Sequence, residues 1–282
     1  MRRRFQQVDV FGSGPFSGNP LAVVLDADGL STEEMLRFTR WANLSESTFL
    51  LPPTTPEADY RVRIFTLAGE LLFAGHPTLG SCHAWLTAGG EPAREDTIVQ
   101  ECGAGLIPIR RDRSRLAFAA PPLTRSGPVD PVFVEDLADV LGLDEASIVD
   151  SQWVDNGPGW VGLLLSSADV VLEVEPDFSR YTGSSSLDIG LAGPYPQDAE
   201  CAFEVRAIFS DEHGAAREDP VTGSLNASLA QWLISTGRAT APYIVAQGAR
   251  MGRRGRVHIS QDAEAVWVGG DTESSIEGHI EI

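Results

Sequence analysis

Two polar residues at equivalent points of an internal repeat are the first candidates for chemistry. The segments 77–86 and 220–229 align without a gap at one constant offset, close to half of the 282-residue chain, and Pro, Gly, Ser, Ala and Leu recur in register. The residue before the repeated proline is His76 in one copy and Asp219 in the other. If the two halves face each other, we expect these two side chains to meet.

Backbone donors follow both prolines and favour a site for an anion. A proline at the first helical position leaves the next N–H groups of the helix free, and these groups and the helix dipole attract a carboxylate or phosphate. The residues that can present such donors are Thr78, Gly80 and Ser81 in one copy and Thr222, Gly223 and Ser224 in the other. The alternative is purely structural: Asp219 caps its own helix and His76 is a satisfied core histidine.

Glu46 is the candidate acid/base, although it lies outside the repeat. It stands in Asn43-Leu44-Ser45-Glu46-Ser47-Thr48, between an apolar helix and an apolar strand. We expect a carboxylate at such a junction to be partly buried, which suits it to proton transfer. The alternative is an exposed glutamate at the end of a helix.

Strands dominate the elements that must position these residues in the first half. We expect a helix over 32–43, where the apolar residues recur at helical spacing, and a second helix from Pro77 to about Leu86. Pro121 to Pro131 is the predicted linker. The predicted strands lie at 5–11, 21–25, 48–51, 60–66, 97–101, 105–110 and 115–119.

The second half repeats this plan. A helix is expected at 133–141, and a second helix from Pro220 to about residue 233. Residues 178–198 are rich in Ser, Gly and Pro and are predicted to be a loop. The predicted strands lie near 160–165, 170–174, 202–209, 243–247, 256–260, 265–268 and 276–281.

The two repeated helices are apolar on nearly every side, and such helices are buried. We therefore predict an α+β fold of two pseudo-symmetric halves, each a barrel-like, mostly antiparallel sheet wrapped around a central helix. The first half spans 1–122 with its helix near 77–88. The second spans 128–282 with its helix near 220–235, and the final strand can return to the first half.

The composition excludes several partners. With 21 basic and 40 acidic residues the net charge is −19, which argues against nucleic acid or an anionic membrane but not against a small anionic metabolite. No stretch approaches the ~20 apolar residues of a membrane span, and no signal-peptide apolar region follows the basic start, so we expect a cytoplasmic protein.

Neither metal chemistry nor thiol chemistry is indicated. Cys82, Cys102 and Cys201 are scattered without metal-ligand spacing, and we expect reduced structural thiols and no metal. The basic cluster of Arg250, Arg253, Arg254 and Arg256 is either a solvated turn or a substrate-facing group.

Five motifs in this order carry a resemblance that spans nearly the whole chain. The chain resembles the PhzF-like phenazine-biosynthesis isomerase family, within the diaminopimelate-epimerase-like fold. The motifs are Gly18-Asn19-Pro20-Leu21-Ala22-Val23, Asn43-Leu44-Ser45-Glu46-Ser47-Thr48-Phe49, Phe73-Ala74-Gly75-His76-Pro77-Thr78, Glu218-Asp219-Pro220-Val221-Thr222-Gly223-Ser224 and Gln247-Gly248…Gly252-Arg253. Asn156-Gly157-Pro158 is a weaker match.

The resemblance implies a cofactor-free isomerase that is often dimeric, so we expect no cofactor and a homodimer. By motif position Glu46 would shuttle the proton, while His76, Asp219 and Ser224 would orient the substrate and relay or stabilise charge. Gly75 and Gly223 would lend backbone donors, and Asn19 and Thr78 would contact the substrate. Leu67 and Leu72 stand where the family usually has Pro, which bears on the identity of the substrate.

Three other functions stay open. The Cys-based epimerases and racemases of this fold carry thiols at the two helix starts, where this chain has Ala74 and Asp219-Pro220, so an epimerase would have to work without cysteine. A serine hydrolase would use Ser224, but the Gly-x-Ser-x-Gly elbow is missing. The third possibility is a non-catalytic protein that binds a small anion and shares the fold of the family but not its catalysis.

Overall fold

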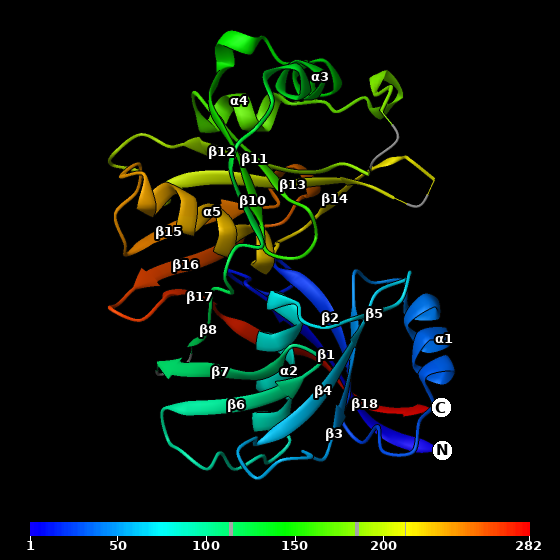
Figure 1. Cartoon of the computed structure of the whole chain (residues 1–282). Coiled ribbons are helices and arrows are strands. Elements are labelled where there is room, and N and C mark those ends of the chain that lie inside the picture. The colour runs from blue at the N-terminus through cyan, green and yellow to red at the C-terminus, as the bar shows by residue number, and fades with distance from the viewer. Residues whose placement is uncertain (113–114, 184–185, 212) are drawn as a thin grey trace. The chain divides into compact units, whose positions relative to one another are not determined.

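The computed structural model describes residues 1–112, 115–183, 186–211 and 213–282, and more of it is strand than helix (Figure 1). The chain divides into two compact units, one of residues 1–119 with 267–282 and the other of residues 120–266. The sequence placed this division between 122 and 128. The final strand, β18 (Thr272–Glu281), pairs with β1 (Arg2–Val10) inside the first unit. That each half is an independent domain stays a prediction.

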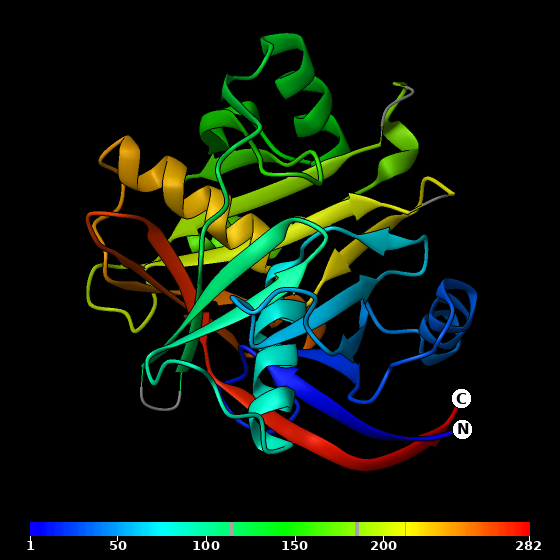
Figure 2. The ribbon, with the colours of Figure 1, turned by 60° about the horizontal axis from the view of Figure 1, so that its bottom comes forward.

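The first unit wraps its strands around helix α2 (Gly75–Thr87), most of whose residues are buried (Figure 2). A Cβ on Gly80 would lie 2.6 Å from Leu21 Cδ2, so glycine lets the sheet approach the helix closely. The other elements are α1 (Thr32–Ala42), β2 (Asn19–Val24), β3 (Ser47–Leu51), β4 (Tyr60–Phe65), β5 (Glu70–Leu71), β6 (Thr97–Cys102), β7 (Gly105–Asp112), β8 (Arg115–Ala119) and β17 (Val266–Gly270).

The second unit is built in the same way around helix α5 (Gly223–Ser235), which is also largely buried. Helices α3 (Pro131–Leu141) and α4 (Ala168–Glu173) contribute to an apolar cluster on the other face of its sheet. The strands are β9 (Arg125–Pro128), β10 (Ile148–Asp155), β11 (Val161–Leu165), β12 (Asp188–Pro194), β13 (Phe203–Ser210), β14 (Ala216–Asp219), β15 (Tyr243–Gln247) and β16 (Gly255–Gln261).

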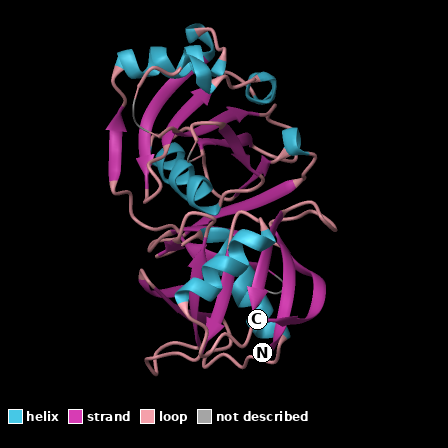
Figure 3. Ribbon diagram, turned by 90° about the vertical axis from the view of Figure 1, so that its right-hand side faces the viewer, coloured by secondary structure: helices cyan, strands magenta, loops and turns pink. Residues whose placement is uncertain are grey.

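Strand pairing confirms the predicted duplicated α+β fold, whose helices are few beside its strands (Figure 3). In the first unit β2–β3 is parallel, β3–β4 and β4–β5 are antiparallel, β4–β6 is parallel and β6–β7 is antiparallel. The second unit repeats this order in β11–β12, β12–β13, β13–β14, β13–β15 and β15–β16. The two parallel pairs of the first unit, β2–β3 and β4–β6, therefore have counterparts in the second unit, β11–β12 and β13–β15.

Two expectations in the second half were wrong. Part of the predicted loop 178–198 is strand β12, and the strand expected near 170–174 is helix α4. The glycines of β12 suggested a loop, but they are needed for packing: a Cβ on Gly190 would lie 2.3 Å from Leu225, and one on Gly193 would lie 2.2 Å from the Ser167 carbonyl. Glycine in a strand often marks such a close approach.

Two arginine–glutamate pairs mark equivalent positions in the two units. Arg63 on β4 donates two hydrogen bonds to Glu70 on β5, and Arg206 on β13 donates two to Glu218 on β14. The central helix begins five residues after the glutamate in both units, at Gly75 and at Gly223. This register makes His76 equivalent to Ser224.

The helix starts differ from those inferred from the repeat. Pro77 is the third residue of α2, whereas Pro220 lies three residues before α5, so Pro220 is not at a first helical position. The cause is the β13–β14 hairpin, which has five more residues between its arginine and its glutamate than β4–β5. By this register the counterpart of Asp219 is Leu71, the residue after Glu70.

Candidate active site

Glu46, His76 and Asn19 form a polar cluster in the first unit. His76 Nε2 lies 3.5 Å from Glu46 Oε2, and Asn19 Nδ2 lies 3.4 Å from His76 Nδ1. The side chain of Glu46 is 16% exposed and that of His76 is 4% exposed. The expected partial burial of Glu46 is therefore confirmed, and its carboxylate lies beside a ring nitrogen.

Burial keeps the His76 ring neutral. Desolvation lowers the pKa of His76 to about 3 from 6.5, so the contact with Glu46 is not an ion pair at neutral pH. An amide N–H can only donate, so Asn19 assigns the acceptor role to Nδ1 and the proton to Nε2. His76 Nε2 and Glu46 Oε2 are 3.5 Å apart without a hydrogen bond between them, and the neutral ring brings no positive charge to this contact.

Local backbone geometry places Glu46 and Asn19. Helix α1 ends at Asn43, which adopts a left-handed conformation, and Glu46 lies in the short link before β3. On the other side, the Asp9 carboxylate accepts hydrogen bonds from the N–H groups of Ser17 and Gly18 and so fixes the turn before Asn19. A Cβ at residue 18 would lie 2.1 Å from the Val10 carbonyl, so only glycine fits there.

The start of α2 carries Gly75, His76 and Thr78. Its N-cap residue, Ala74, has no side-chain cap hydrogen bond. Thr78 is fully buried, and its hydroxyl accepts a hydrogen bond from Gln100 Nε2 at 3.0 Å. The structure thus brings Gly75 and His76 to the helix start, and the substrate-binding role of Thr78 stays a prediction.

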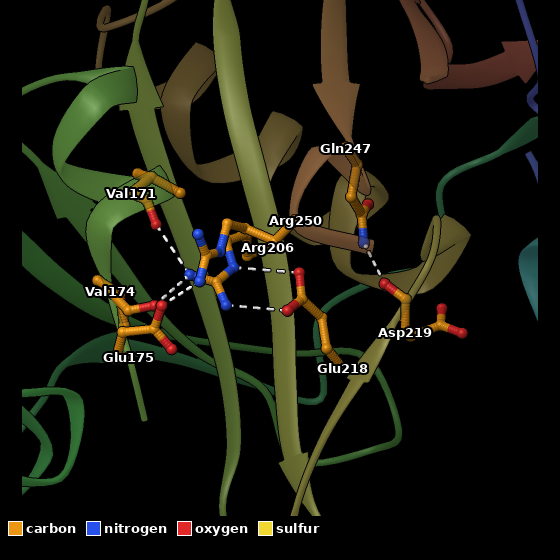
Figure 4. Close-up of polar contacts among 8 residues, drawn as sticks. All are labelled: Val171, Val174, Glu175, Arg206, Glu218, Asp219, Gln247 and Arg250. Carbon is orange, nitrogen blue, oxygen red and sulfur yellow. Dashed lines mark hydrogen bonds and ion pairs between the residues drawn. The ribbon is translucent and has the colours of Figure 1, made fainter. Parts of the chain in front are cut away.

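Asp219 lies in a second cluster, in the other unit, that is organised by Gln247 (Figure 4). The Asp219 carboxylate accepts a 2.6 Å hydrogen bond from the Thr222 hydroxyl, and its carbonyl accepts one from Gln247 Nε2. Gln247 is 1% exposed, and its Oε1 accepts from the Thr222 N–H at 3.0 Å and from Asn226 Nδ2 at 2.7 Å. A buried amide therefore satisfies the start of α5 and ties it to Asp219.

Ser224 is the second residue of α5 and is partly exposed. Its hydroxyl accepts a hydrogen bond from Trp160 Nε1 at 3.1 Å, and its carbonyl accepts one from Asn156 Nδ2 at 2.8 Å. An asparagine thus contacts the second helix residue in both units, Asn19 at His76 and Asn156 at Ser224. Because indole N–H only donates, the Ser224 O–H remains available to donate to a ligand.

The strand that carries Asp219 is anchored by Arg206. The Arg206 guanidinium donates to the carbonyls of Val171 and Val174 on one side and to the Glu218 carboxylate on the other (Figure 4). The Arg206 side chain is 4% exposed and that of Glu218 is 16% exposed. A buried guanidinium that donates four hydrogen bonds is therefore the fixed point next to Asp219.

The basic cluster of the sequence analysis is partly accounted for by ion pairs. Arg250 pairs with Glu175, and Arg256 lies 3.3 Å from a carboxylate oxygen of Glu200. These two contacts support the structural interpretation for Arg250 and Arg256.

Sequence reasoning missed Gln247, Asn226, Trp160 and Asn156 as members of the site. Gln247 and Asn156 lay in recognised motifs, but their partners come from distant segments, which no local pattern reveals. Trp160 follows Asn156-Gly157-Pro158-Gly159, a turn-forming run that ends in a buried indole. The signal available in the sequence was a large aromatic residue, Trp160, directly after a turn that contains two glycines.

Metal and thiol chemistry gain no support from the described residues. Among them, no group of three or more His, Cys, Asp or Glu is placed to hold a metal ion. Cys82 is a free thiol inside α2, and burial raises its pKa to about 12, so it is a poor nucleophile. In the same part of the chain, no helix is long and apolar enough to cross a membrane.

Comparison with known proteins decides the family. Residues 8–278 match the family described as phenazine biosynthesis-like protein. The chain belongs to this family. Trans-2,3-dihydro-3-hydroxyanthranilate isomerase of Pseudomonas aeruginosa is 33% identical over 98% of each chain. "Antisense-enhancing sequence 1" of Schizosaccharomyces pombe is 32% identical over 97% of each.

Solved structures of this family share the fold. The crystal structure of the Bacillus anthracis phenazine biosynthesis protein, PhzF family, has a TM-score of 0.80 at 23% identity and covers all of both chains. The resemblance inferred from five motifs is therefore confirmed. Since relatives over nearly the full length are named isomerases, the protein is an isomerase of the phenazine biosynthesis-like family.

Proposed function

We propose that this isomerase moves a proton within a small carboxylate-bearing substrate, with a shift of a double bond and without a cofactor. The observation that carries the proposal is the contact between Glu46 Oε2 and the neutral His76 ring at 3.5 Å. A carboxylate in a partly buried position, beside a hydrogen-bond donor that carries no charge, suits both removal and return of a proton.

The proton transfer is balanced within the substrate. The Glu46 carboxylate takes a C–H proton, and the electron pair of that bond becomes part of the new π system. The Glu46 carboxylic acid then gives a proton to another carbon of the same system, where a π pair becomes the new C–H bond. During the reaction His76 Nε2–H would donate to the carboxylate form of Glu46, a hydrogen bond that would have to form from the present 3.5 Å contact, and Asn19 fixes the ring tautomer that makes this possible.

The other predicted residues would bind and orient the substrate. Ser224 offers a hydroxyl proton, and Gly75 and Gly223 begin the two central helices, where backbone donors and the helix dipole favour a carboxylate. Asp219, held by Thr222 and Gln247, would relay or balance charge. Asn19 and Thr78 complete the predicted set, and the small anionic metabolite and the homodimer belong to the same proposal.

Ser224 is less suited to a hydrolase. A nucleophilic serine needs a base that accepts its proton, whereas its recorded side-chain partner is the N–H of Trp160, which cannot accept one. A non-catalytic binder would keep the anion site, but it would not need an acid/base beside His76.

The test uses the full chain and trans-2,3-dihydro-3-hydroxyanthranilate, the compound named in the curated relatives. The compound is incubated with the protein in D2O and followed by proton NMR. We expect a shifted double bond and deuterium at the carbon that gains the proton. Binding of the compound without isomerisation or exchange would favour the binder, and would contradict catalysis on this compound.

A further inference from the structure

Strand β18 presents an open edge of the first unit. It pairs with β1 on one side and lies at the outside of the ribbon (Figure 2, red). Residues 276–279 are exposed, and the side chain of Ile276 is 51% exposed. From residue 276 to residue 281 the pairing with β1 keeps one register, without a bulge and without a proline. An exposed, unbroken edge strand is a template for pairing with another strand.

The hydrogen-bond pattern shows which backbone groups of β18 point away from β1. The Leu25 N–H donates to the Arg4 carbonyl at 3.0 Å, so the backbone of Arg4 is bonded on the β2 side. Residues along a strand alternate between its two sides, so His279, which is opposite Arg4, forms a pair without hydrogen bonds. The N–H and C=O groups of His279 therefore point to the open edge, as do those of Glu277 and Glu281.

The side chains of this edge are divided between an apolar and a polar face. Ile280 packs against the apolar cluster that includes residues of helix α1. Residues two apart on a strand share a face, so Ile276 and Gly278 lie on the same face as Ile280. Glu277 and His279 lie on the opposite face. The edge thus presents one apolar and one polar row to whatever pairs with it.

Gly278 has no explanation inside the first unit. A Cβ at this position would meet no heavy atom of the described residues within 4 Å, and its φ is not in the left-handed region. By contrast, Gly190 and Gly193 of β12 are required by contacts of 2.3 Å and 2.2 Å. Glycine weakens a strand, and it often marks the close approach of another backbone. The open space beside Gly278 is therefore a second sign that another strand binds there.

We propose that the open edge of β18 pairs antiparallel with the same edge of a second copy of this chain, about a two-fold axis at Gly278. In this register Glu277 lies opposite His279 of the second copy, and Ile276 lies opposite Ile280 of the second copy. A two-fold interface uses the same patch on both subunits. The inference rests on the homodimer of the proposed function and supplies its interface, but it does not depend on proton transfer.

The charges along the edge favour this register. An axis at Glu277 would set that glutamate against its own copy, and an axis at His279 would set Glu277 against Glu281. An axis at position 276 would set Glu281 against Asp271, and one at position 280 would shorten the paired segment. Like charges directly opposite each other destabilise a sheet. The axis at Gly278 avoids every acidic pair and keeps the longer overlap.

The pairing at Gly278 also satisfies the backbone and both faces. Glu277 and His279 both direct their backbone groups outward, so each Glu277–His279 pair exchanges two N–H···O=C hydrogen bonds. On the apolar face, the exposed Ile276 is covered by Ile280 of the second copy. On the polar face, His279 Nδ1 lies 3.3 Å from an Arg2 guanidinium nitrogen, which only donates. His279 Nε2 then carries the proton and can donate to the Glu277 carboxylate of the second copy.

The first experiment measures the dimer of the full chain by analytical ultracentrifugation over a series of concentrations. The wild type should sediment as a dimer. His279→Pro removes an N–H that faces the second copy and none that binds β1, so the unit should keep its circular dichroism spectrum. We expect this variant to raise the dimer dissociation constant by about 30-fold or more, since a backbone hydrogen bond is lost from each copy.

A charge exchange tests the register. His279→Glu sets an acidic side chain against Glu277 twice, once on each side of the axis, and should raise the dissociation constant by about 10-fold. The double variant Glu277→Arg/His279→Glu restores opposite charges and should return the dissociation constant to within about threefold of the wild type. Gln261→Glu, which adds an acidic side chain at an exposed position of β16, is the control and should change nothing.

A disulfide tests the position of the axis. Opposite residues without hydrogen bonds have Cα atoms about 4.5 Å apart, within the range of about 4.4–6.8 Å that a disulfide spans. Gly278→Cys should therefore form a disulfide between two copies on mild oxidation. Glu277→Cys is the control, because its own copy lies diagonally across the axis, about 7–8 Å away or more. Both variants carry Cys102→Ser, which removes the half-buried native thiol.

The outcomes separate this interface from the rest of the account. A wild type that is monomeric at every concentration overturns the interface and the homodimer of the proposed function. A wild-type dimer that withstands His279→Pro, or that is not cross-linked by Gly278→Cys, overturns this interface alone. Isomerase activity is not a readout here. A dimer cross-linked at position 278 supports the interface, even if the protein does not turn over the proposed substrate.

Discussion

His76 Nε2 lies 3.5 Å from Glu46 Oε2 in a site where the imidazole is neutral. The contact is therefore one between a carboxyl group and a neutral, dipolar ring, without a second full charge. A protonated histidine would make a neighbouring carboxylate a weaker base, and the buried, neutral ring of His76 does not have this effect. Asn19 contributes by fixing the tautomer.

The depressed pKa of His76 predicts an acid-sensitive stability. The folded state resists protonation down to about pH 3, while the unfolded chain takes up a proton near pH 6.5. Stability from this residue is thus present above pH 6.5 and is lost as the pH falls, with a slope that approaches about 1.4 kcal/mol per pH unit. Urea unfolding of His76→Gln between pH 6.5 and pH 4 should show a flatter slope by that amount.

The control for this measurement is His279→Gln, which removes an exposed histidine. Its unfolding free energy should follow the wild-type dependence on pH. A His76→Gln variant with the wild-type slope would mean that His76 is not held neutral in the folded state.

Because the two arginine–glutamate pairs differ in burial, we expect the same Arg→Met substitution to lower the free energy of unfolding by different amounts. Arg206→Met removes a guanidinium that is 4% exposed and leaves the Glu218 carboxylate and two carbonyls without their donor. Breaking a buried pair costs about 3–5 kcal/mol, so we expect a loss of that size in the free energy of unfolding.

Arg63→Met is the matched comparison, since Arg63 and Glu70 are 26% and 38% exposed. A more exposed pair contributes about 1 kcal/mol or less. Urea denaturation of both variants measures the difference. Equal losses would contradict the view that Arg206 is the buried anchor of strand β14.

We expect the replacement of Gln247 to destabilise the start of α5. Gln247→Leu removes the acceptor of the Thr222 N–H and one of the two acceptors of the Asn226 amide, and it removes the donor to the Asp219 carbonyl. Unsatisfied buried groups cost about 1–3 kcal/mol each, so we expect about 3 kcal/mol in total and faster amide hydrogen exchange at the first turn of α5. Gln261→Leu, at an exposed position, should change neither quantity.

The fold was largely predictable because its signals are local. Alternating strands, helices apolar all round and the repeated segments at 77–86 and 220–229 were enough to infer two sheets, each wrapped around a helix. The register of the repeat was not predictable. The shared Pro, Gly and Ser residues invited an alignment through Pro77 and Pro220, and only the strand pairing shows that the longer β13–β14 hairpin shifts the helix start.

Candidate site residues could be proposed from the sequence where a motif carried them, and could not be proposed where distant segments meet. Glu46, His76, Asp219 and Ser224 came from short motifs, and the structure adds that Glu46, His76 and Asn19 are neighbours. Strand β12 could not be found, because it contains Gly190 and Gly193, which resemble a loop. Glycines that admit a helix side chain and glycines that form a turn look alike in one sequence.

The central claim is that Glu46 carries the proton, and one measurement tests it most directly. Glu46→Gln keeps the size of the side chain but removes its proton affinity, and Glu33→Gln, at an exposed position in α1, is the control. Both variants are incubated with trans-2,3-dihydro-3-hydroxyanthranilate in D2O. Isomerisation and deuterium uptake should fall at least about 100-fold in Glu46→Gln, with folding and ligand binding intact, and persist in Glu33→Gln. Wild-type turnover in Glu46→Gln would contradict the account.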